Sequence, residues 1–278
     1  GISNAVGLAI ARTHMASQYN RKDFPLFDHN VYVICGDGCL QEGVSSEACS
    51  LAGHLKLGSL IVLYDDNKIQ IDGSTDLAFT EDVLKRYESY GWHTQTVVDG
   101  DQDVNSIRDA IRKAKAVTDK PSIIKIRTII GYGSAKQGTH GVHGAPLGPD
   151  DIANVKKKFG MNPDESYSVN PEVMKYYRRA ASAGQAQHDL WNKMFENYAK
   201  SYPKEATELR RRLAGHFPET IKFPSFEPGH KDATRGYSGK VLAAISPAIP
   251  EMLCGSADLS PSNKTNNPGW GGDFQAAT

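Results

Sequence analysis

Short apolar runs alternate with amphipathic stretches along the first half of the chain. Strand-like runs, most of them apolar, cover residues 31–35, 60–64, 93–98 and 122–130. Helical patterns cover residues 2–19, 41–55, 80–90 and 103–117. Strands that alternate with helices are typical of a parallel sheet covered on both faces, in which ligands bind beyond the carboxyl ends of the strands. The pattern therefore predicts an α/β fold built on a parallel sheet.

The second half of the chain has a different character. A loop rich in glycine and histidine, 131–149, is long enough to be functional, and polar helices follow it. Segment 216–234 is rich in proline and is typical of a surface linker. A helix over 235–245 and a strand over 251–254 then indicate a second α/β domain. We expect a first domain over residues 1–200, a linker region over 201–234 and the start of a second domain over 235–278.

Composition narrows the class of protein. The 278 residues are 39% hydrophobic and 23% charged, which is typical of an ordinary globular chain rather than a disordered one. The 32 basic and 32 acidic residues cancel, so no overall basic field favours a nucleic-acid partner. No apolar run approaches the length of a membrane span. We therefore expect neither a nucleic-acid nor a membrane partner.

The four cysteines show no metal-ligand spacing. Cys35 and Cys254 fall in expected strands, so both are predicted to be buried free thiols. Free thiols suit a reducing compartment, and the cytoplasm is the compartment we expect. The chain opens at Gly1 inside a motif, so a preceding targeting peptide, and with it a plastid or another organelle, stays open.

Two polar segments follow neighbouring apolar runs and point to a bound diphosphate. Gly36-Asp37-Gly38 comes directly after the run 31–35, and Asn67 comes just after the run 60–64. Each is an ordinary turn signal alone. Together they place a carboxylate and an amide oxygen beyond two strand ends, where Mg²⁺ shares oxygen ligands with a phosphate. Gly38 lets the backbone approach a phosphate without a Cβ in the way.

The amino-acid sequence around these residues resembles that of the transketolases, a family of thiamine diphosphate-dependent enzymes. The similar segments occur in the same order as in that family. Together they extend over nearly the whole of this chain. They are GISNAVG (1–7), GDGCLQEG (36–43), AGHLKL (52–57), DDNKI (65–69), IDG (71–73), HGVHGAPL (140–147), GSADL (255–259) and PSN (261–263).

The resemblance implies a transferase. A transketolase moves a two-carbon ketol unit from a ketose phosphate to an aldose phosphate through a thiamine diphosphate carbanion, as in the pentose phosphate pathway. It also implies a homodimer with shared active sites. In that frame residues 1–200 form the diphosphate- and metal-binding domain, and residues 235–278 begin the pyrimidine-binding domain.

The resemblance further implies a set of cofactor residues. Asp37, Asn67 and the backbone oxygen of Ile69 would bind Mg²⁺ or Ca²⁺. Gly38 and Asn67 would contact the diphosphate.

Other cofactor residues implied by the resemblance are apolar or lie further along the chain. Ile71 and Ile130 would pack against the cofactor rings. His143 would contact both the diphosphate and the substrate, and is the expected catalytic residue. Asp258 would reach the cofactor from the second subunit.

Two more residues implied by the resemblance concern the substrate. Arg235 and Ser262 would hold a sugar phosphate, because a guanidinium fork and a hydroxyl suit phosphate oxygens. Glu42 and Glu47 either belong to a carboxylate set at a dimer interface or are ordinary acids on a helix surface; the sequence leaves both open.

The chain resembles the middle of a longer protein. The family's upstream histidines would precede Gly1, and the glutamate that activates the aminopyrimidine would follow Thr278. Two alternatives to a transketolase stay open: a dihydroxyacetone synthase that uses formaldehyde as acceptor, and a catalytically silent fragment that binds thiamine diphosphate. A synthase that decarboxylates pyruvate fits less well, because segments 140–147 and 260–263 follow the transketolase pattern.

Overall fold

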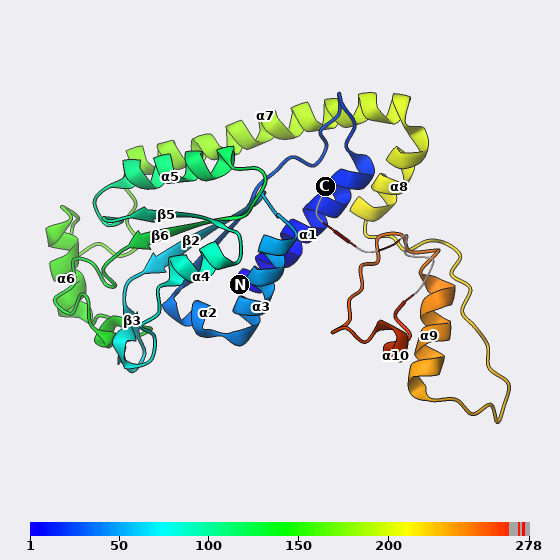
Figure 1. Cartoon of the computed structure of the whole chain (residues 1–278). Helices are drawn as coiled ribbons and strands as arrows, with labels where there is room; N and C mark the ends of the chain where they lie inside the picture. Colours follow the sequence, from blue (N-terminus) through cyan, green and yellow to red (C-terminus); the bar gives the residue numbers. More distant parts are fainter. Residues whose placement is uncertain (267–271, 273, 276–278) are drawn as a thin grey trace. The chain divides into compact units, whose positions relative to one another are not determined.

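The computed structural model of the chain describes residues 1–266, 272 and 274–275 (Figure 1). They form two compact units: Gly1–Lys193, and a second unit from Met194 onward. The predicted second domain, 235–278, therefore lies partly outside the described residues. The predicted domain boundaries at 200 and 234 remain predictions.

The first unit contains a four-stranded sheet in which all neighbouring strands run parallel. The strand order is β1-β2-β6-β5, which requires helical crossovers between parallel neighbours. The strands are β1 (Val31–Gly36), β2 (Leu60–Asp66), β5 (His93–Val97) and β6 (Ser122–Arg127). The predicted parallel sheet is confirmed, although the last strand ends at Arg127 rather than at residue 130.

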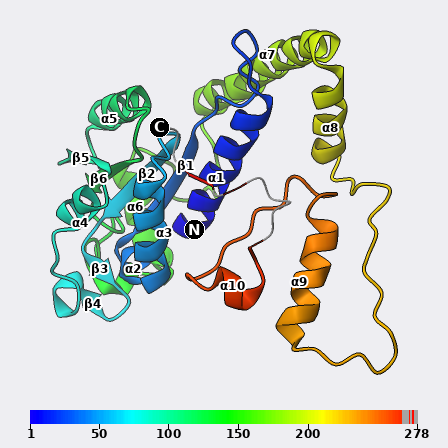
Figure 2. The same cartoon turned by 45° about the vertical axis from the view of Figure 1, so that its right-hand side comes forward.

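Helices cover both faces of this sheet. Helix α1 (Ile2–Tyr19), helix α3 (Gly43–His54) and helix α4 (Val83–Ser89) belong to one layer, in which α1 packs on α3 and α4 is hydrogen-bonded to it. Helix α5 (Val104–Ala116) packs on strands β5, β6 and β2, on the other face (Figures 1 and 2). Two covered faces explain why the central strands β2 and β6 are near-continuous apolar runs, whereas β5 at the edge of the sheet is largely polar.

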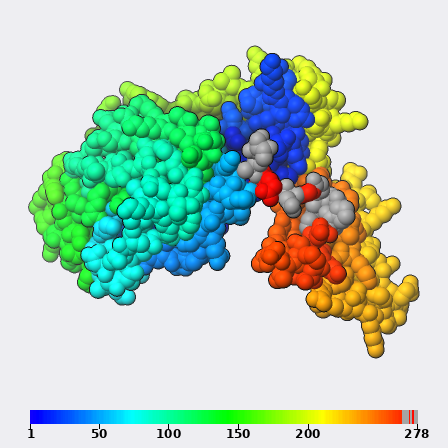
Figure 3. Space-filling model, in the orientation of Figure 1, coloured from blue at the N-terminus to red at the C-terminus, as the bar shows by residue number. Residues whose placement is uncertain are grey.

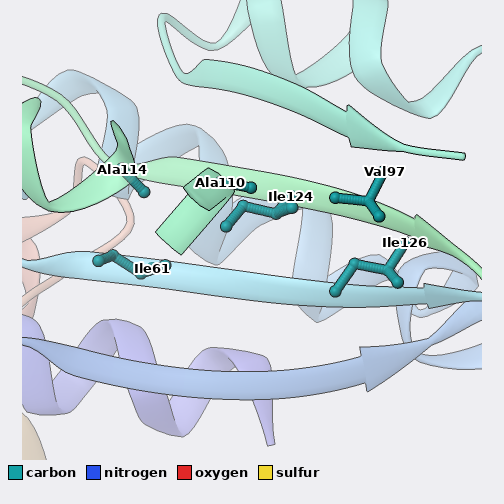
Figure 4. Packing of buried hydrophobic residues seen from close by; sticks show 6 residues of the cluster. All are labelled: Ile61, Val97, Ala110, Ala114, Ile124 and Ile126. Carbon is teal, nitrogen blue, oxygen red and sulfur yellow. The ribbon is translucent and has the colours of Figure 1, made fainter. Parts of the chain in front are cut away.

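The core under α5 is a small aliphatic cluster (Figure 4). Alanines on the inner side of the helix allow it to approach the isoleucines and the valine of three strands closely. The buried members are Ile61, Val97, Ala110, Ala114, Ile124 and Ile126. This packing fixes the strand ends that carry the polar residues discussed below.

The predicted helix 41–55 is wrong in its boundaries. The chain turns into helix α2 (Asp37–Gln41) directly at the strand end, and α3 begins only at Gly43. The extended backbone of Glu42, with ψ 130°, separates them. Within α3, Gly53 lies against the backbone of Tyr90, where an added Cβ would stand 1.9 Å from the carbonyl oxygen.

Short elements extend beyond the carboxyl edge of the sheet. A two-stranded antiparallel hairpin follows β2, and a single 3₁₀ turn closes it. These elements are β3 (Ile69–Gln70), β4 (Gly73–Ser74) and η1 (Thr75–Leu77). After β6 come η2 (His140–Val142), α6 (Pro149–Lys158) and α7 (Pro171–Ser201).

The regular elements in the described part of the second unit are helices, joined by long irregular segments. It contains α8 (Pro203–Leu213), α9 (Thr234–Ile245) and α10 (Ser260–Asn263). The predicted strand over 251–254 is wrong, because no strand in the described part of this unit is present to pair with it. Cys254 is accordingly exposed rather than buried, whereas Cys35 is buried as predicted. No helix among the described residues is long and apolar enough to span a bilayer.

Candidate functional site

The carboxyl ends of β1 and β2 lie side by side and bring the predicted polar residues together. Their parallel register pairs Cys35 with Tyr64 and Gly36 with Asp65. Asp37, the next residue, starts α2, and only 2% of it is exposed. Asn67 follows β2 directly. The two side chains predicted to bind a metal therefore extend from adjacent strand ends.

Both carboxylate oxygens of Asp37 accept hydrogen bonds. The Tyr64 hydroxyl donates to Oδ1 at 2.5 Å, and the Lys68 backbone N–H donates to Oδ2 at 3.1 Å. Burial raises the pKa of the Asp37 carboxyl, and the Tyr64 and Lys68 hydrogen bonds act in the opposite direction. Lys68 has a φ of 65°, a left-handed conformation that its position in the loop imposes.

Asn67 is also held by neighbours. Its Nδ2 donates to Asp65 Oδ2 at 3.2 Å, and its Oδ1 accepts from the Ile69 N–H at 3.0 Å. Asp65 in turn accepts a hydrogen bond from the Thr128 hydroxyl. This chain of contacts ties the loop after β2 to the end of β6.

Asp66, directly before Asn67 in the chain, is a buried carboxylate. Lys68 Nζ lies 3.1 Å from Oδ1, and Lys125 Nζ lies 3.5 Å from Oδ2. The Asp66 carbonyl accepts from the Arg127 guanidinium at 2.8 Å. Two cations therefore balance the charge of Asp66, which a buried carboxylate requires.

A cleft of about 370 Å³ opens beside this edge. Its lining includes Gly38, Ile69, Ile71 and His143, together with the rest of the β3–β4 hairpin. Ile71 is 71% exposed, so an apolar side chain faces open space there. A Cβ at Gly38 would meet no atom within 4 Å. In Figure 3 the cyan atoms, which include the β3–β4 hairpin, lie at the visible surface of the first unit.

The loop that carries His143 is exposed at its tip and anchored at its start. Asp151 of α6 accepts hydrogen bonds from the Ser134 hydroxyl at 2.6 Å and the Ala135 N–H at 3.0 Å. These contacts lower the pKa of Asp151, the backbone hydrogen bond of Ala135 most. Ile130 accepts a backbone hydrogen bond from Gly138 and is not among the residues that line the cleft.

The second unit carries the other predicted residues. Arg235 lies in the first turn of α9, Ser262 lies in α10, and Asp258 has a left-handed φ of 60°. All three are exposed, and within the described part of the chain their side chains make no hydrogen bond or ion pair. In the first unit, Glu42 and Glu47 are also exposed.

The sequence analysis missed Tyr64, Asp65 and Asp66. Tyr64, Asp65 and Asp66 form the carboxyl end of β2. The contact of Tyr64 with Asp37 depends on the register of β1 against β2. The contacts of Asp65 with Thr128 and of Asp66 with Lys125 depend on the pairing of β2 with β6. The available signal was three consecutive hydrogen-bonding residues at the carboxyl end of a buried strand, directly before Asn67.

The donor set at this edge fits a hard divalent cation. Asp37, Asn67 and the Ile69 carbonyl offer a carboxylate, an amide and a backbone oxygen, and Mg²⁺ and Ca²⁺ prefer oxygen ligands. A carboxylate has about four lone-pair positions, so Asp37 keeps acceptor capacity beyond its two hydrogen bonds. Among the described residues, no group of three His, Cys, Asp or Glu side chains is placed to hold a metal ion.

Comparison with known proteins gives one consistent family. The model of the family described as "Transketolase, thiamine diphosphate binding domain" matches residues 1–218. The transketolase of Scheffersomyces stipitis is 52% identical over 280 residues, covering 100% of this chain and 41% of that protein. Transketolase 2 of Saccharomyces cerevisiae is 50% identical, covering 99% of this chain and 41% of its own length.

Solved structures agree with these relatives. The crystal structure of a Pichia stipitis transketolase in complex with sedoheptulose-7-phosphate matches with a TM-score of 0.92 and 52% identity, covering 97% of this chain and 40% of that chain. A transketolase from Leishmania mexicana matches with a TM-score of 0.92 and 45% identity, covering 98% and 40%. The chain thus spans about two-fifths of the length of these proteins.

Proposed function

This chain belongs to the transketolase family, and from that premise we propose that its protein transfers a two-carbon ketol unit between sugar phosphates with bound thiamine diphosphate. The observation that carries the proposal is the location of Asp37 and Asn67 at adjacent strand ends beside an open cleft. A carboxylate and an amide in that place suit a diphosphate held through a cation.

The first unit would hold the metal and the diphosphate. We propose that Asp37, Asn67 and the Ile69 carbonyl bind Mg²⁺ or Ca²⁺, and that Gly38 and Asn67 contact the diphosphate. The hydrogen bonds that fix Asp37 and Asn67 support this assignment, because a site whose ligands are already oriented loses less entropy on binding.

The remaining residues of the first unit would meet the organic part of the cofactor and the substrate. The exposed Ile71 offers an apolar surface to a ring, and Ile130 is proposed to do the same. Thiamine diphosphate supplies an electron sink that stabilises the carbon–carbon bond cleavage. His143, exposed at the cleft, is proposed as the catalytic residue, since an imidazole can donate or accept a proton at a substrate oxygen near neutral pH.

The second unit would recognise the substrate and complete a neighbouring site. Arg235 and Ser262 are proposed to bind the phosphate of the sugar, and Asp258 to reach the cofactor of a second subunit in a homodimer. Their exposure and their lack of side-chain partners in the described residues leave all three available for such contacts. A similar transketolase binds sedoheptulose-7-phosphate, which supports sugar phosphates as substrates.

The proposed setting is the pentose phosphate pathway in a reducing compartment, the cytoplasm or a plastid. Cys35, Cys39, Cys49 and Cys254 are all free thiols, which is consistent with such a compartment. Because the chain spans about 41% of its relatives, we expect residues 1–278 alone to show no ketol transfer.

The test is cofactor binding by the full-length protein. We expect thiamine diphosphate to bind only with Mg²⁺ or Ca²⁺. Asp37→Ala removes an anionic ligand and should weaken that binding at least about tenfold, which is roughly 1.4 kcal/mol. Isothermal titration calorimetry with and without metal measures both effects.

Asp109→Ala is the matched control, because it removes an exposed carboxylate on α5, where Asp109 forms an ion pair with Arg112. Metal-independent binding that Asp37→Ala leaves unchanged would contradict the proposed site. Turnover of formaldehyde in preference to phosphorylated aldoses would instead indicate a dihydroxyacetone synthase.

A further inference from the structure

The geometry points to Tyr64 as a positioning residue for the metal: its hydroxyl orients the Asp37 carboxylate and thereby sets how well the site accepts Mg²⁺ relative to Ca²⁺. This inference rests on the proposed metal site and assigns a role to a residue outside the proposed ligand set.

Tyr64 reaches Asp37 from the neighbouring strand. Its side chain is fully buried, and its hydroxyl lies 2.5 Å from Asp37 Oδ1. The parallel register places Tyr64 opposite Cys35, two residues before Asp37, so the contact follows from the pairing of β1 and β2.

A tyrosine hydroxyl has one proton and can donate it to one carboxylate at a time. Asp66 Oδ1 also lies near that hydroxyl, but at 3.2 Å rather than 2.5 Å. Asp66 has Lys68 and Lys125 as cationic partners, whereas Asp37 has no ion pair among the described residues. The proton of Tyr64 is therefore directed to Asp37.

Two donors from different segments hold the two oxygens of Asp37. Tyr64 fixes Oδ1 from β2, and the Lys68 N–H fixes Oδ2 from the loop that carries Asn67. Rotation of the carboxylate about χ2 would break both hydrogen bonds. Groups that hydrogen-bond to metal ligands in this manner orient the ligands, and losing one typically weakens metal binding about 10–100-fold.

The two candidate metals differ in how much they depend on this orientation. Mg²⁺ requires near-ideal octahedral geometry with oxygens at about 2.0–2.1 Å, whereas Ca²⁺ tolerates flexible geometry at about 2.3–2.6 Å. A carboxylate free to rotate therefore disfavours Mg²⁺ more than Ca²⁺. The ratio of the two dissociation constants therefore reports the orientation of the Asp37 carboxylate. A general loss of stability would not change this ratio.

The experiment compares Tyr64→Phe with wild type in the full-length protein at saturating thiamine diphosphate. Titrations with Mg²⁺ and separately with Ca²⁺ are followed by calorimetry. We expect the Kd for Mg²⁺ to rise about 10–100-fold and the Kd for Ca²⁺ to rise less, so that the Mg²⁺/Ca²⁺ ratio of Kd values increases.

Tyr87→Phe is the matched control. Tyr87 is also a fully buried tyrosine of the first unit, and its hydroxyl contacts the Cys49 sulfur at 3.3 Å, away from the cleft. Its loss should leave both metal affinities unchanged. Thermal unfolding of each variant shows whether the fold is retained.

Two substitutions with unnatural amino acids keep the test decisive if Tyr64→Phe fails to fold. With 4-fluorophenylalanine in place of Tyr64 the hydroxyl volume is filled but no donor is present, so Mg²⁺ affinity should fall. With 4-aminophenylalanine a donor is restored, and the Mg²⁺/Ca²⁺ ratio should return toward that of wild type.

A Mg²⁺ affinity of Tyr64→Phe within twofold of wild type would overturn the inference. Equal weakening of Mg²⁺ and Ca²⁺ would overturn it as well, because a purely structural role predicts that result. Wild-type protein that binds the cofactor without any metal would instead refute the proposed function.

Discussion

The two units hold their candidate functional residues in opposite ways. In the first unit, Asp37 is buried and Asn67 half-buried, and each has named hydrogen-bond partners at the carboxyl edge of a packed sheet. In the second, Arg235, Ser262 and Asp258 are exposed, and no side-chain partner is found for them among the described residues.

This difference separates two tasks: orienting the ligands of a metal ion and binding the phosphate of a substrate. A cation with strict geometry benefits from ligands fixed before binding, at the cost of burying polar groups that then need partners. An arginine that reads a phosphate acts mainly through charge and a planar fork, so a solvated position is sufficient. Substitutions in the first unit should therefore affect stability and binding together, and those in the second should affect binding alone.

The largest expected effect tests whether the sheet core supports the ordered edge. Ile124 of β6 is fully buried under α5. Ile124→Ala removes buried methyl and methylene groups and leaves a cavity, so it should lower the free energy of unfolding by about 2–5 kcal/mol. Denaturant unfolding of the full-length protein, followed by tryptophan fluorescence, measures it.

Leu253→Ala serves as the comparison in the second unit, because Leu253 is 46% exposed. It should change the free energy of unfolding by less than about 1 kcal/mol. A similar loss of stability for both variants would contradict the contrast between a packed first unit and an open second one.

The next expected effect tests whether the exposed arginine reads phosphate. Arg235→Ala removes a charge-assisted contact worth about 1.5–3 kcal/mol. It should raise KM for a phosphorylated aldose with a smaller change in kcat, because the contact lies at a non-reacting end of the substrate. The measurement is kcat/KM for phosphorylated over unphosphorylated acceptors.

Arg112→Ala is the control for this change, since Arg112 is an exposed arginine of the first unit that pairs with Asp109. It should leave the ratio unaltered, and the melting temperature of Arg235→Ala should equal that of wild type. If the ratio of acceptors is the same in wild type and Arg235→Ala, Arg235 does not bind the phosphate.

The smallest expected effect concerns the ion pairs of α8. Hydrogen bonds from Arg211, and with them those from Arg212, lower the pKa of Glu208 to about 2. A carboxyl whose pKa is lower in the folded state contributes stability above its unfolded pKa of about 4.3, and that contribution is lost as pH falls toward 2. We expect a loss of roughly 1 kcal/mol over this range, since the pair is only partly buried.

Unfolding curves of wild type and Glu208→Gln between pH 5 and pH 2 measure this contribution. The variant should start less stable and lose less stability with acid. Parallel pH profiles for the two proteins would show that Glu208 contributes nothing that depends on its charge.

The sequence by itself determined the layer architecture and the polar residue types at the candidate site. Strand-like runs between helical patterns identified the four strands of the sheet. The central strands are the most apolar, because both of their faces are covered. The order of strand, Gly36-Asp37-Gly38, strand and Asn67 predicted that both polar residues stand at the same edge. The structure confirms that placement.

The sequence did not determine the features that depend on contacts between distant segments. The strand expected over 251–254 does not form, since an isolated extended segment leaves its backbone groups unpaired. The helix expected over 41–55 divides at Glu42, a boundary that local propensity does not mark.

Only the tertiary structure decided how the candidate ligands are held. From the sequence alone, Tyr64 is one more residue of a buried strand, and Asp65 is typical of a turn. The hydrogen bond from Tyr64 to Asp37 exists because β1 and β2 pair in one register, which brings the hydroxyl within 2.5 Å of the carboxylate. The hydrogen bond that Asp65 accepts from Thr128 likewise depends on the pairing of β2 with β6. Register is a property of paired strands, so a list of residues along one chain does not contain it.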